Sequence, residues 1–114
     1  MNDCIFCKIV TGILPANIIY QDKEIIAFDD IHPKAPQHKL IVPRKHIATM
    51  NDLSTDDKGL ISNMIMVAQK LAIDLKIDKN GYRVLINCNR DGGQVVYHLH
   101  LHLLGGKPLT FKEW

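Results

Sequence analysis

The sequence lacks the features that mark secreted and membrane proteins. It has three cysteines in 114 residues, and two of them form Cys4-x-x-Cys7, so a disulfide framework of the secreted kind is not indicated. No stretch approaches the roughly 18 consecutive apolar residues of a membrane helix. The start, Met1-Asn2-Asp3-Cys4, lacks the basic and then apolar layout of a signal peptide. We therefore expect a cytoplasmic protein with no membrane partner.

The sequence also lacks a strong excess of one charge. It has 14 Lys and Arg against 12 Asp and Glu, a net charge of +2, and the basic residues are scattered. A nucleic-acid groove is therefore not indicated. Hydrophobic residues make up 46% and charged residues 23% of the chain, which is ordinary for a globular protein. The length fits one domain over residues 1–114.

Apolar periodicity and turn residues predict an α+β fold with an antiparallel meander sheet. Two helices are expected, a short one over residues 4–10 and a long one that Ser54 caps, over residues 54–75. The loop at 30–37 contains two prolines, which exclude a central strand. Five candidate strands are apolar runs bounded by turns: residues 18–21, 25–28, 38–43, 82–88 and 97–104.

Three histidines, His98, His100 and His102, alternate with apolar residues in the last candidate strand. Successive side chains of a strand point to opposite faces. The three imidazoles therefore share one face, and Tyr97 and three leucines occupy the other. This row suits chemistry on a small anion such as phosphate. It equally suits a metal, since His-x-His on a strand is a common pair of ligands. Histidines with a purely structural role are the third interpretation.

The chain resembles the histidine-triad (HIT) superfamily, whose signature is three histidines alternating with apolar residues. The match here is His98-Leu99-His100-Leu101-His102-Leu103-Leu104. The strings IFCKI, AFDDIHPKAPQHKLIVPRKHI and GYRVLIN, and the LLGG that ends the last strand, are similar to the Hint branch. The resemblance covers nearly the whole chain. It implies a five-stranded antiparallel sheet with one long helix, in a homodimer.

The resemblance also implies an activity, the hydrolysis of purine nucleoside 5′-phosphoramidates and related adenylates to the nucleoside monophosphate and an amine. The middle histidine, His100, would be the nucleophile and would form a covalent nucleotidyl intermediate. His102 is the candidate for contact with the phosphate and the leaving group, and His38 matches a fourth active-site histidine. Two alternatives stay open. One is a nucleotide-binding regulatory or scaffold protein with slow turnover, and the other is a dinucleoside polyphosphate hydrolase.

The nucleoside pocket is also carried over from the family by position. Asp30 looks like the carboxylate that accepts the ribose hydroxyls. Many Hint proteins have a serine where this chain has Val95, so the leaving-group preference is in doubt. The residues expected to form the apolar slot for the base are Phe6, Ile9, Phe28 and Ile31. Those expected to surround the α-phosphate are Asn87 and Gln94, together with the backbone N–H groups near Gly93 and Val95.

Cys4 and Cys7 have the spacing of a two-thiolate half-site for zinc. In many bacterial HIT proteins such a pair is completed by two histidines, which match His46 and His98 here. The resemblance thus implies a structural zinc and no organic cofactor. His98 would then be a ligand; without zinc it returns to the catalytic candidates. The tail from Leu109 to Trp114 is expected to border the active site of the partner subunit in the dimer.

Overall fold

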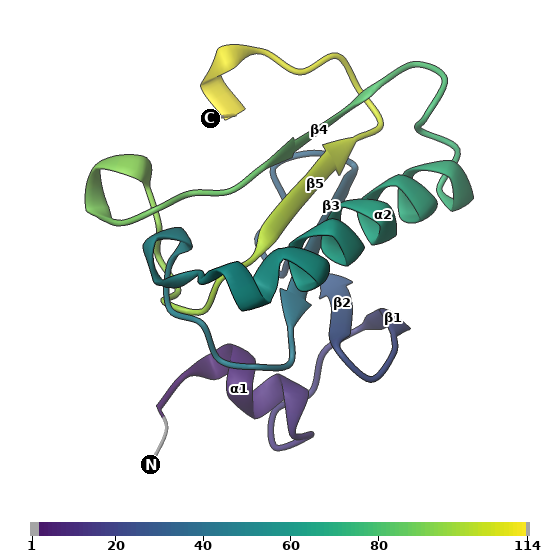
Figure 1. Ribbon diagram of the computed structural model, residues 1–114. Helices are drawn as coiled ribbons and strands as arrows, with labels where there is room; N and C mark the ends of the chain where they lie inside the picture. Colours follow the sequence, from purple (N-terminus) through teal and green to yellow (C-terminus); the bar gives the residue numbers. More distant parts are fainter. Residues whose placement is uncertain (1–2, 114) are drawn as a thin grey trace.

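The computed structural model describes residues 3–113, and it confirms the α+β fold (Figure 1). A short helix α1 (Ile5–Val10) precedes the sheet, and a long helix α2 (Lys58–Asp74) follows its third strand. The sheet is antiparallel, and its strands lie side by side in the order β1 (Ile18–Gln21), β2 (Ile25–Asp29), β3 (Gln37–Pro43), β5 (Leu101–Gly105) and β4 (Tyr82–Leu85). The meander prediction is wrong for the last two strands, because the long connection through α2 leaves the place beside β3 to β5.

Helix α2 covers one face of the sheet (Figure 1). It begins where expected, because Ser54 and Asp57 form a reciprocal capping box over the 3₁₀ turn that leads into it. Its buried side chains, Met64 and Leu71 among them, pack on Leu99, Leu101 and Leu103. The three leucines that alternate with the histidines thus belong to the main core, as the alternation predicts. Tyr97, expected on the same face, is 45% exposed and lies outside that core.

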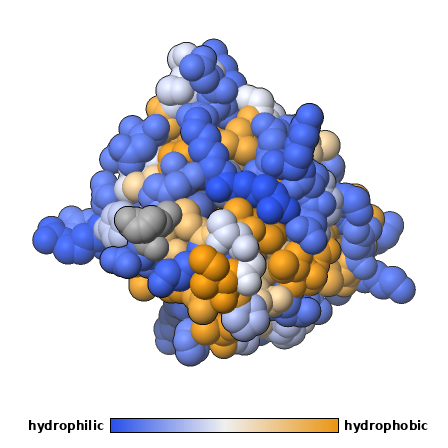
Figure 2. Space-filling model, turned by 90° about the horizontal axis from the view of Figure 1, so that it is seen from below, coloured by the Kyte–Doolittle hydropathy of each residue, from blue (hydrophilic) through white to orange (hydrophobic). Residues whose placement is uncertain are grey.

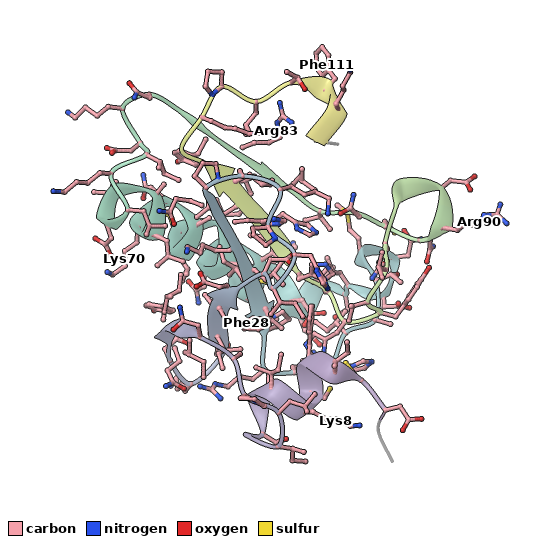
Figure 3. The ribbon with its side chains drawn as sticks, turned by 180° about the vertical axis from the view of Figure 1, so that it is seen from behind. Lys8, Phe28, Lys70, Arg83, Arg90 and Phe111 are labelled. Atoms are coloured by element: carbon pink, nitrogen blue, oxygen red, sulfur yellow. The ribbon has the colours of Figure 1, made fainter. Side chains whose placement is uncertain are left out.

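A second, smaller cluster covers the opposite face of the sheet. Phe6 of α1 packs there on four residues of the middle strands: Ile26, Phe28, Leu40 and Val42. The rings of Phe6 and Phe28 meet edge to face with centroids 5.4 Å apart, and Phe28 lies on the α1 side of β2 (Figure 3). The sheet therefore separates a leucine-rich core under α2 from an aromatic layer under α1.

The last two strands are shorter than predicted. β5 begins at Leu101 and not at residue 97, and β4 ends at Leu85 and not at residue 88. The β3–β5 ladder reaches Ile41 opposite Leu101, and β3 ends two residues later at Pro43, which has no N–H to extend it. Before Leu101 the chain bonds elsewhere, since the Leu99 N–H donates to the Ile47 carbonyl at 2.6 Å.

The loop between β4 and β5 is constrained by one side chain. Asn89 has φ 60° and ψ −174°, a conformation that normally requires glycine. Its N–H donates to Gln94 Oε1 at 2.9 Å, and Gln94 Nε2 donates to the carbonyls of Ala48 and Val96 at 2.9 and 3.1 Å. Gln94 is thus a buried brace between this loop and the segment after β3. Arg90 projects into solvent at the tip of the loop (Figure 3).

The C-terminal segment crosses the molecule at the end away from α1 (Figure 1). Arg83 Nη1 donates to the Thr110 carbonyl at 2.8 Å and holds it there. Phe111 is 95% exposed beyond that contact, at the opposite end from α1 (Figure 3). Trp114, also expected in the partner contact, lies outside the described residues. In the range 3–113, neither helix has the length and apolar composition that crossing a membrane requires.

Candidate active site

The histidine row keeps one face, although only His102 lies within β5. His98, His100 and His102 are 0%, 7% and 6% exposed, and the rings of His100 and His102 have centroids 4.8 Å apart. Phe6 lies edge-on against two of them, 6.0 Å from His98 and 5.1 Å from His100 between ring centroids. The imidazoles therefore point to the aromatic layer and the leucines point to α2.

The protonation of His100 follows from its backbone partner. Its Nδ1 lies 2.7 Å from the His98 carbonyl oxygen. Because a carbonyl oxygen only accepts, the neutral ring must carry its proton on Nδ1. The lone pair is then on Nε2, the nitrogen on the far side of the ring. His100 is thus oriented as a nucleophile or base at Nε2.

A second chain of contacts orients His102. The Lys34 N–H donates to His38 Nδ1 at 3.1 Å, so a neutral His38 carries its proton on Nε2. That nitrogen lies 3.0 Å from His102 Nδ1 and 3.4 Å from Asp30 Oδ2. His102 therefore accepts at Nδ1 and carries its own proton on Nε2.

Burial keeps these rings neutral. Removal from water lowers the pKa of His38, His98 and His100 below the ordinary 6.5. For His38 and His100 the nearby Asp30 carboxylate opposes this effect. Burial, with His100 and His38 beside it, lowers the pKa of His102 to about 3. At neutral pH the site therefore holds uncharged imidazoles with fixed hydrogen-bonding directions.

Cys4, Cys7, His46 and His98 form a separate group, the thiol–imidazole cluster. Cys4 Sγ and Cys7 Sγ each lie 3.4 Å from His98 Nδ1, and His46 Nδ1 lies 3.2 Å from both Cys7 Sγ and His98 Nδ1. A tetrahedron with zinc–ligand bonds of about 2.0–2.3 Å has edges of about 3.3–3.8 Å. His98 Nε2 donates to the Pro43 carbonyl at 2.8 Å, which leaves Nδ1 as a lone pair facing the thiols. The residues therefore fit a closed tetrahedral metal site.

The three triad rings do not converge on one metal. His98 faces the thiols, whereas His100 and His102 present their ring nitrogens to other partners. Asp30, His38 and His102 also place donor atoms close together. However, the Lys34 N–H keeps the proton of His38 on Nε2, the nitrogen that faces the group. Of the three interpretations of the row, metal binding suits His98, and chemistry on an anion suits His100 and His102.

The predicted base slot is assembled only in part. Phe6 and Phe28 are buried in the aromatic layer, and Ile9 packs against it. Ile31 is 84% exposed in the loop after β2 and is not part of that cluster. Asp30 lies at the start of the same loop, where its Oδ1 accepts the His32 N–H at 2.8 Å. The carboxylate is thereby fixed beside His38 at the edge of the site.

Several donors of the predicted phosphate site already form hydrogen bonds that hold the β4–β5 loop. Gln94 braces the loop, Asn87 Nδ2 donates to the Gly92 carbonyl at 2.7 Å, and the Gly93 N–H donates to the Arg90 carbonyl. Val95 is 87% exposed, and within residues 3–113 its N–H donates to no other backbone group. The backbone N–H of Val95 is therefore a candidate donor to a phosphate, and phosphate contacts by all four residues stay predictions.

Comparison with known proteins identifies the family of this chain. The sequence profile of the HIT domain matches residues 11–109. The chain belongs to the HIT domain family.

Relatives of this HIT protein share almost its full length. A HIT-like protein of Buchnera aphidicola subsp. Baizongia pistaciae (strain Bp) is 55% identical over 106 residues, 93% of this chain and 95% of that protein. The purine nucleoside phosphoramidase of Escherichia coli (strain K12) is 49% identical over 108 residues, 95% of this chain and 91% of that protein. The crystal structure of a HIT family hydrolase from Legionella pneumophila Philadelphia 1 matches with a TM-score of 0.95 at 50% identity, covering 98% of this chain and all of that one.

Several groups that orient the histidines of this HIT protein could not be found from its sequence. They are the Lys34 N–H and the carbonyls of Pro43 and His98. Every residue has a carbonyl and every residue except proline has an N–H, so residue type carries almost no signal for these groups. The sequence predicts Gln94 as a phosphate contact and gives no sign that its carboxamide braces the loop.

Acid should destabilise the fold through His102. Its pKa is 6.5 in the unfolded chain and about 3 in the fold, so between these values the unfolded state binds more protons. The neutral His102 therefore makes its full contribution to the free energy of unfolding above pH 6.5, and this contribution is lost as the pH decreases toward 3. Between pH 7 and pH 5 the free energy of unfolding falls by about 2 kcal/mol for this reason. Urea unfolding at both pH values should show that His102→Gln loses less stability than the wild type by about this amount. A matched control, His32→Gln in the exposed loop, should behave like the wild type. Equal pH dependence in all three proteins would contradict the assignment.

Proposed function

We propose that this protein hydrolyses purine nucleoside 5′-phosphoramidates and related adenylates to the nucleoside monophosphate and an amine. The proposal rests on the hydrogen bond that His100 Nδ1 donates to the His98 carbonyl oxygen. Because of this bond, the lone pair of the buried, neutral ring is on Nε2. The 49% identity to a protein named purine nucleoside phosphoramidase supports the substrate class. An AMP- or GMP-type nucleotide would be the bound product.

In the first step His100 Nε2 attacks the α-phosphorus and the P–N bond to the amine breaks. The product is a nucleotidyl-histidine, a covalent intermediate that divides one difficult transfer into two. The leaving nitrogen must gain a proton. His102 Nε2 is the candidate donor, because bound phosphate adds negative charge beside the ring, raises its pKa and favours uptake of a second proton from solvent. The resulting imidazolium gives its Nε2 proton to the leaving nitrogen and becomes neutral.

In the second step water attacks the phosphorus and the bond to His100 Nε2 breaks. His102 is neutral after the first step, so it can accept the proton that the water loses. Nucleoside monophosphate leaves, and both histidines return to their initial protonation states. The same two rings thus serve in both steps, with His102 alternating between acid and base.

A nucleotide-binding protein with slow turnover is the second candidate. The observation that favours it is Val95, which offers an exposed N–H but no hydroxyl near the leaving group. A missing hydroxyl removes one hydrogen bond, worth about 0.5–1.5 kcal/mol, so it lowers the rate without removing the nucleophile. The two candidates differ in rate and share the pocket.

We also propose a structural zinc in the thiol–imidazole cluster, because four donors of the correct kind stand at tetrahedral spacing. Zinc bound there would fix α1 and His98 in place and supply no open coordination position. A pair of cysteines that form no disulfide and serve in this way suits a reducing compartment such as the cytoplasm.

A homodimer is proposed from the surface that the fold leaves open. β4 is an edge strand, and an exposed edge is a template for pairing with another chain. Helix α2 also exposes Ile65, Met66 and Ile73, each about half accessible. A second copy that covers these groups would bring the tail with Phe111 toward the site of its partner.

In sedimentation velocity, the full-length protein should have the mass of two chains, whereas a monomer at micromolar concentration would contradict the proposal.

Replacing the nucleophile should abolish turnover and keep binding. We expect His100→Ala to lose at least three orders of magnitude in kcat on an adenosine phosphoramidate, since no covalent intermediate can form. Affinity for AMP, measured by calorimetry, should change by less than about tenfold. His32→Ala is the matched histidine control and should retain wild-type turnover. Residual activity of His100→Ala within tenfold of wild type would disprove the covalent route.

Asp30→Ala should weaken ribonucleotides more than 2′-deoxy analogues. The carboxylate can accept a hydrogen bond from the 2′-hydroxyl, and a bond to a charged acceptor is worth about 1.5–3 kcal/mol. Comparing kcat/KM for matched ribo and 2′-deoxy phosphoramidates isolates this contact from any effect of Asp30 on His38. If both sugars lose the same factor, Asp30 does not bind the 2′-hydroxyl.

The purified protein should contain about one zinc ion per chain by metal analysis. Because the binding energy of a structural zinc is also folding energy, Cys4→Ser should lower both the zinc content and the melting temperature, the latter by at least about 5 °C. Cys88→Ser is the control that should change neither. Metal-free wild-type protein with freely titratable thiols would refute the zinc proposal.

A further inference from the structure

Cys4 and Cys7 form an adjacent dithiol near the surface of the molecule. Cys4 precedes α1, and its Sγ accepts the Cys7 N–H at 3.4 Å. The two sulfur atoms lie within 4.8 Å of each other, and both residues are half-buried. Because neither cysteine is fully buried, a small oxidant can reach the pair without unfolding the chain. Figure 2 views the molecule from the side on which α1 lies in Figure 1.

The third cysteine offers no such chemistry. Cys88 follows β4, and in the part of the chain that the structure describes it belongs to no group of metal-ligating side chains. A sulfenic acid formed on a thiol is captured by a second thiol where one is close. Only the Cys4–Cys7 pair meets that condition among the described cysteines.

We propose that Cys4 and Cys7 are a reversible oxidation site. A peroxide converts the two thiols to an intramolecular disulfide, which disrupts the thiol–imidazole cluster and slows the reaction at His100. The proposal rests on the zinc site proposed above. The reagent class is a two-electron oxidant, a hydroperoxide.

The oxidation balances in two displacements. One thiolate attacks the terminal peroxide oxygen, so that an S–O bond forms and the O–O bond breaks with release of hydroxide. The other thiolate attacks the sulfenic sulfur, so that the S–S bond forms and a second hydroxide leaves. Two protons from solvent convert the hydroxides to water. Both sulfurs are oxidised by one electron each, the peroxide takes up two, and neither thiolate remains to bind a metal ion.

The cluster communicates with the nucleophile through His98. The side chain of His98 is held by the cluster at Nδ1 and by the Pro43 carbonyl at Nε2, and its own carbonyl accepts the His100 Nδ1 proton. Residues three apart in a helical turn have Cβ atoms about 5–6 Å apart, whereas a disulfide needs about 3.5–4.5 Å. Oxidation therefore draws Cys4 and Cys7 together and removes them from His98. Phe6 stands between the two cysteines and contacts both His98 and His100, so it shifts with the turn.

The experiment treats the reduced, zinc-containing full-length protein with increasing hydrogen peroxide. Released zinc is measured with a chromogenic chelator, the Cys4–Cys7 disulfide by peptide mass after alkylation of free thiols, and turnover on an adenosine phosphoramidate. We expect one zinc released per disulfide, with turnover reduced on the order of tenfold, as for a lost supporting shell. A thiol reductant with added zinc should restore turnover. Cys88→Ser should behave like the wild type, and Cys4→Ser should form no disulfide.

The outcomes separate this proposal from those it rests on. If the protein contains one zinc per chain, and peroxide neither releases the zinc nor forms the disulfide, the oxidation site is overturned. The zinc proposal then still holds. Disulfide formation and zinc release with unchanged turnover overturn the coupling to His100. Protein that contains no zinc before treatment overturns the zinc proposal, and with it the cluster on which this inference rests. Loss of turnover that requires Cys88 also contradicts the proposal.

Discussion

The hydrogen bond from His100 Nδ1 to the His98 carbonyl oxygen is the contact on which the proposed chemistry depends. It decides which nitrogen of a buried ring carries the lone pair. The acceptor belongs to the backbone, so it is only as well placed as the segment before β5. Three contacts fix that segment: His98 Nε2 to Pro43, His98 Nδ1 to the thiol–imidazole cluster, and the Leu99 N–H to Ile47. The cluster and the nucleophile are therefore parts of one structural unit.

The sheet provides this unit with two different environments. On one face, Leu99, Leu101 and Leu103 are anchored in the core under α2. On the other, burial beneath α1 lowers the pKa of the histidines and keeps them neutral. Burying four imidazoles costs stability, since each loses the option of being charged and hydrated. The cost is limited because their ring nitrogens meet backbone or side-chain partners, as the Pro43 carbonyl does for His98.

Much of this arrangement could be predicted from the sequence because it depends on side-chain pattern. The alternation from His98 to Leu104 predicts the two faces, the capping box at Ser54 and Asp57 predicts the long helix, and the polar turns predict the separate strands. The strand order, with β5 between β3 and β4, could not be predicted in this way. The pairing of Cys4 and Cys7 with His46 and His98 came from the family resemblance, and the structure brings these four residues together.

The remaining features depend on backbone geometry, which residue type does not specify. β5 starts late because β3 ends at Pro43 and the Leu99 N–H bonds to Ile47. The side chain of Gln94 braces the loop at Asn89, because that backbone is strained and its N–H needs a buried acceptor. The tautomers of His38 and His100 follow from one N–H and one carbonyl, and neither can be read from a motif.

Those tautomers are the most direct test of the account. Long-range ¹H–¹⁵N correlation spectra of the reduced protein at neutral pH distinguish a protonated from an unprotonated nitrogen in each imidazole. The structure requires His100 to carry its proton on Nδ1, and His38 and His102 to carry theirs on Nε2. A spectrum with His100 protonated on Nε2, or with an imidazolium at that position, would show that the lone pair is not where the proposed reaction needs it.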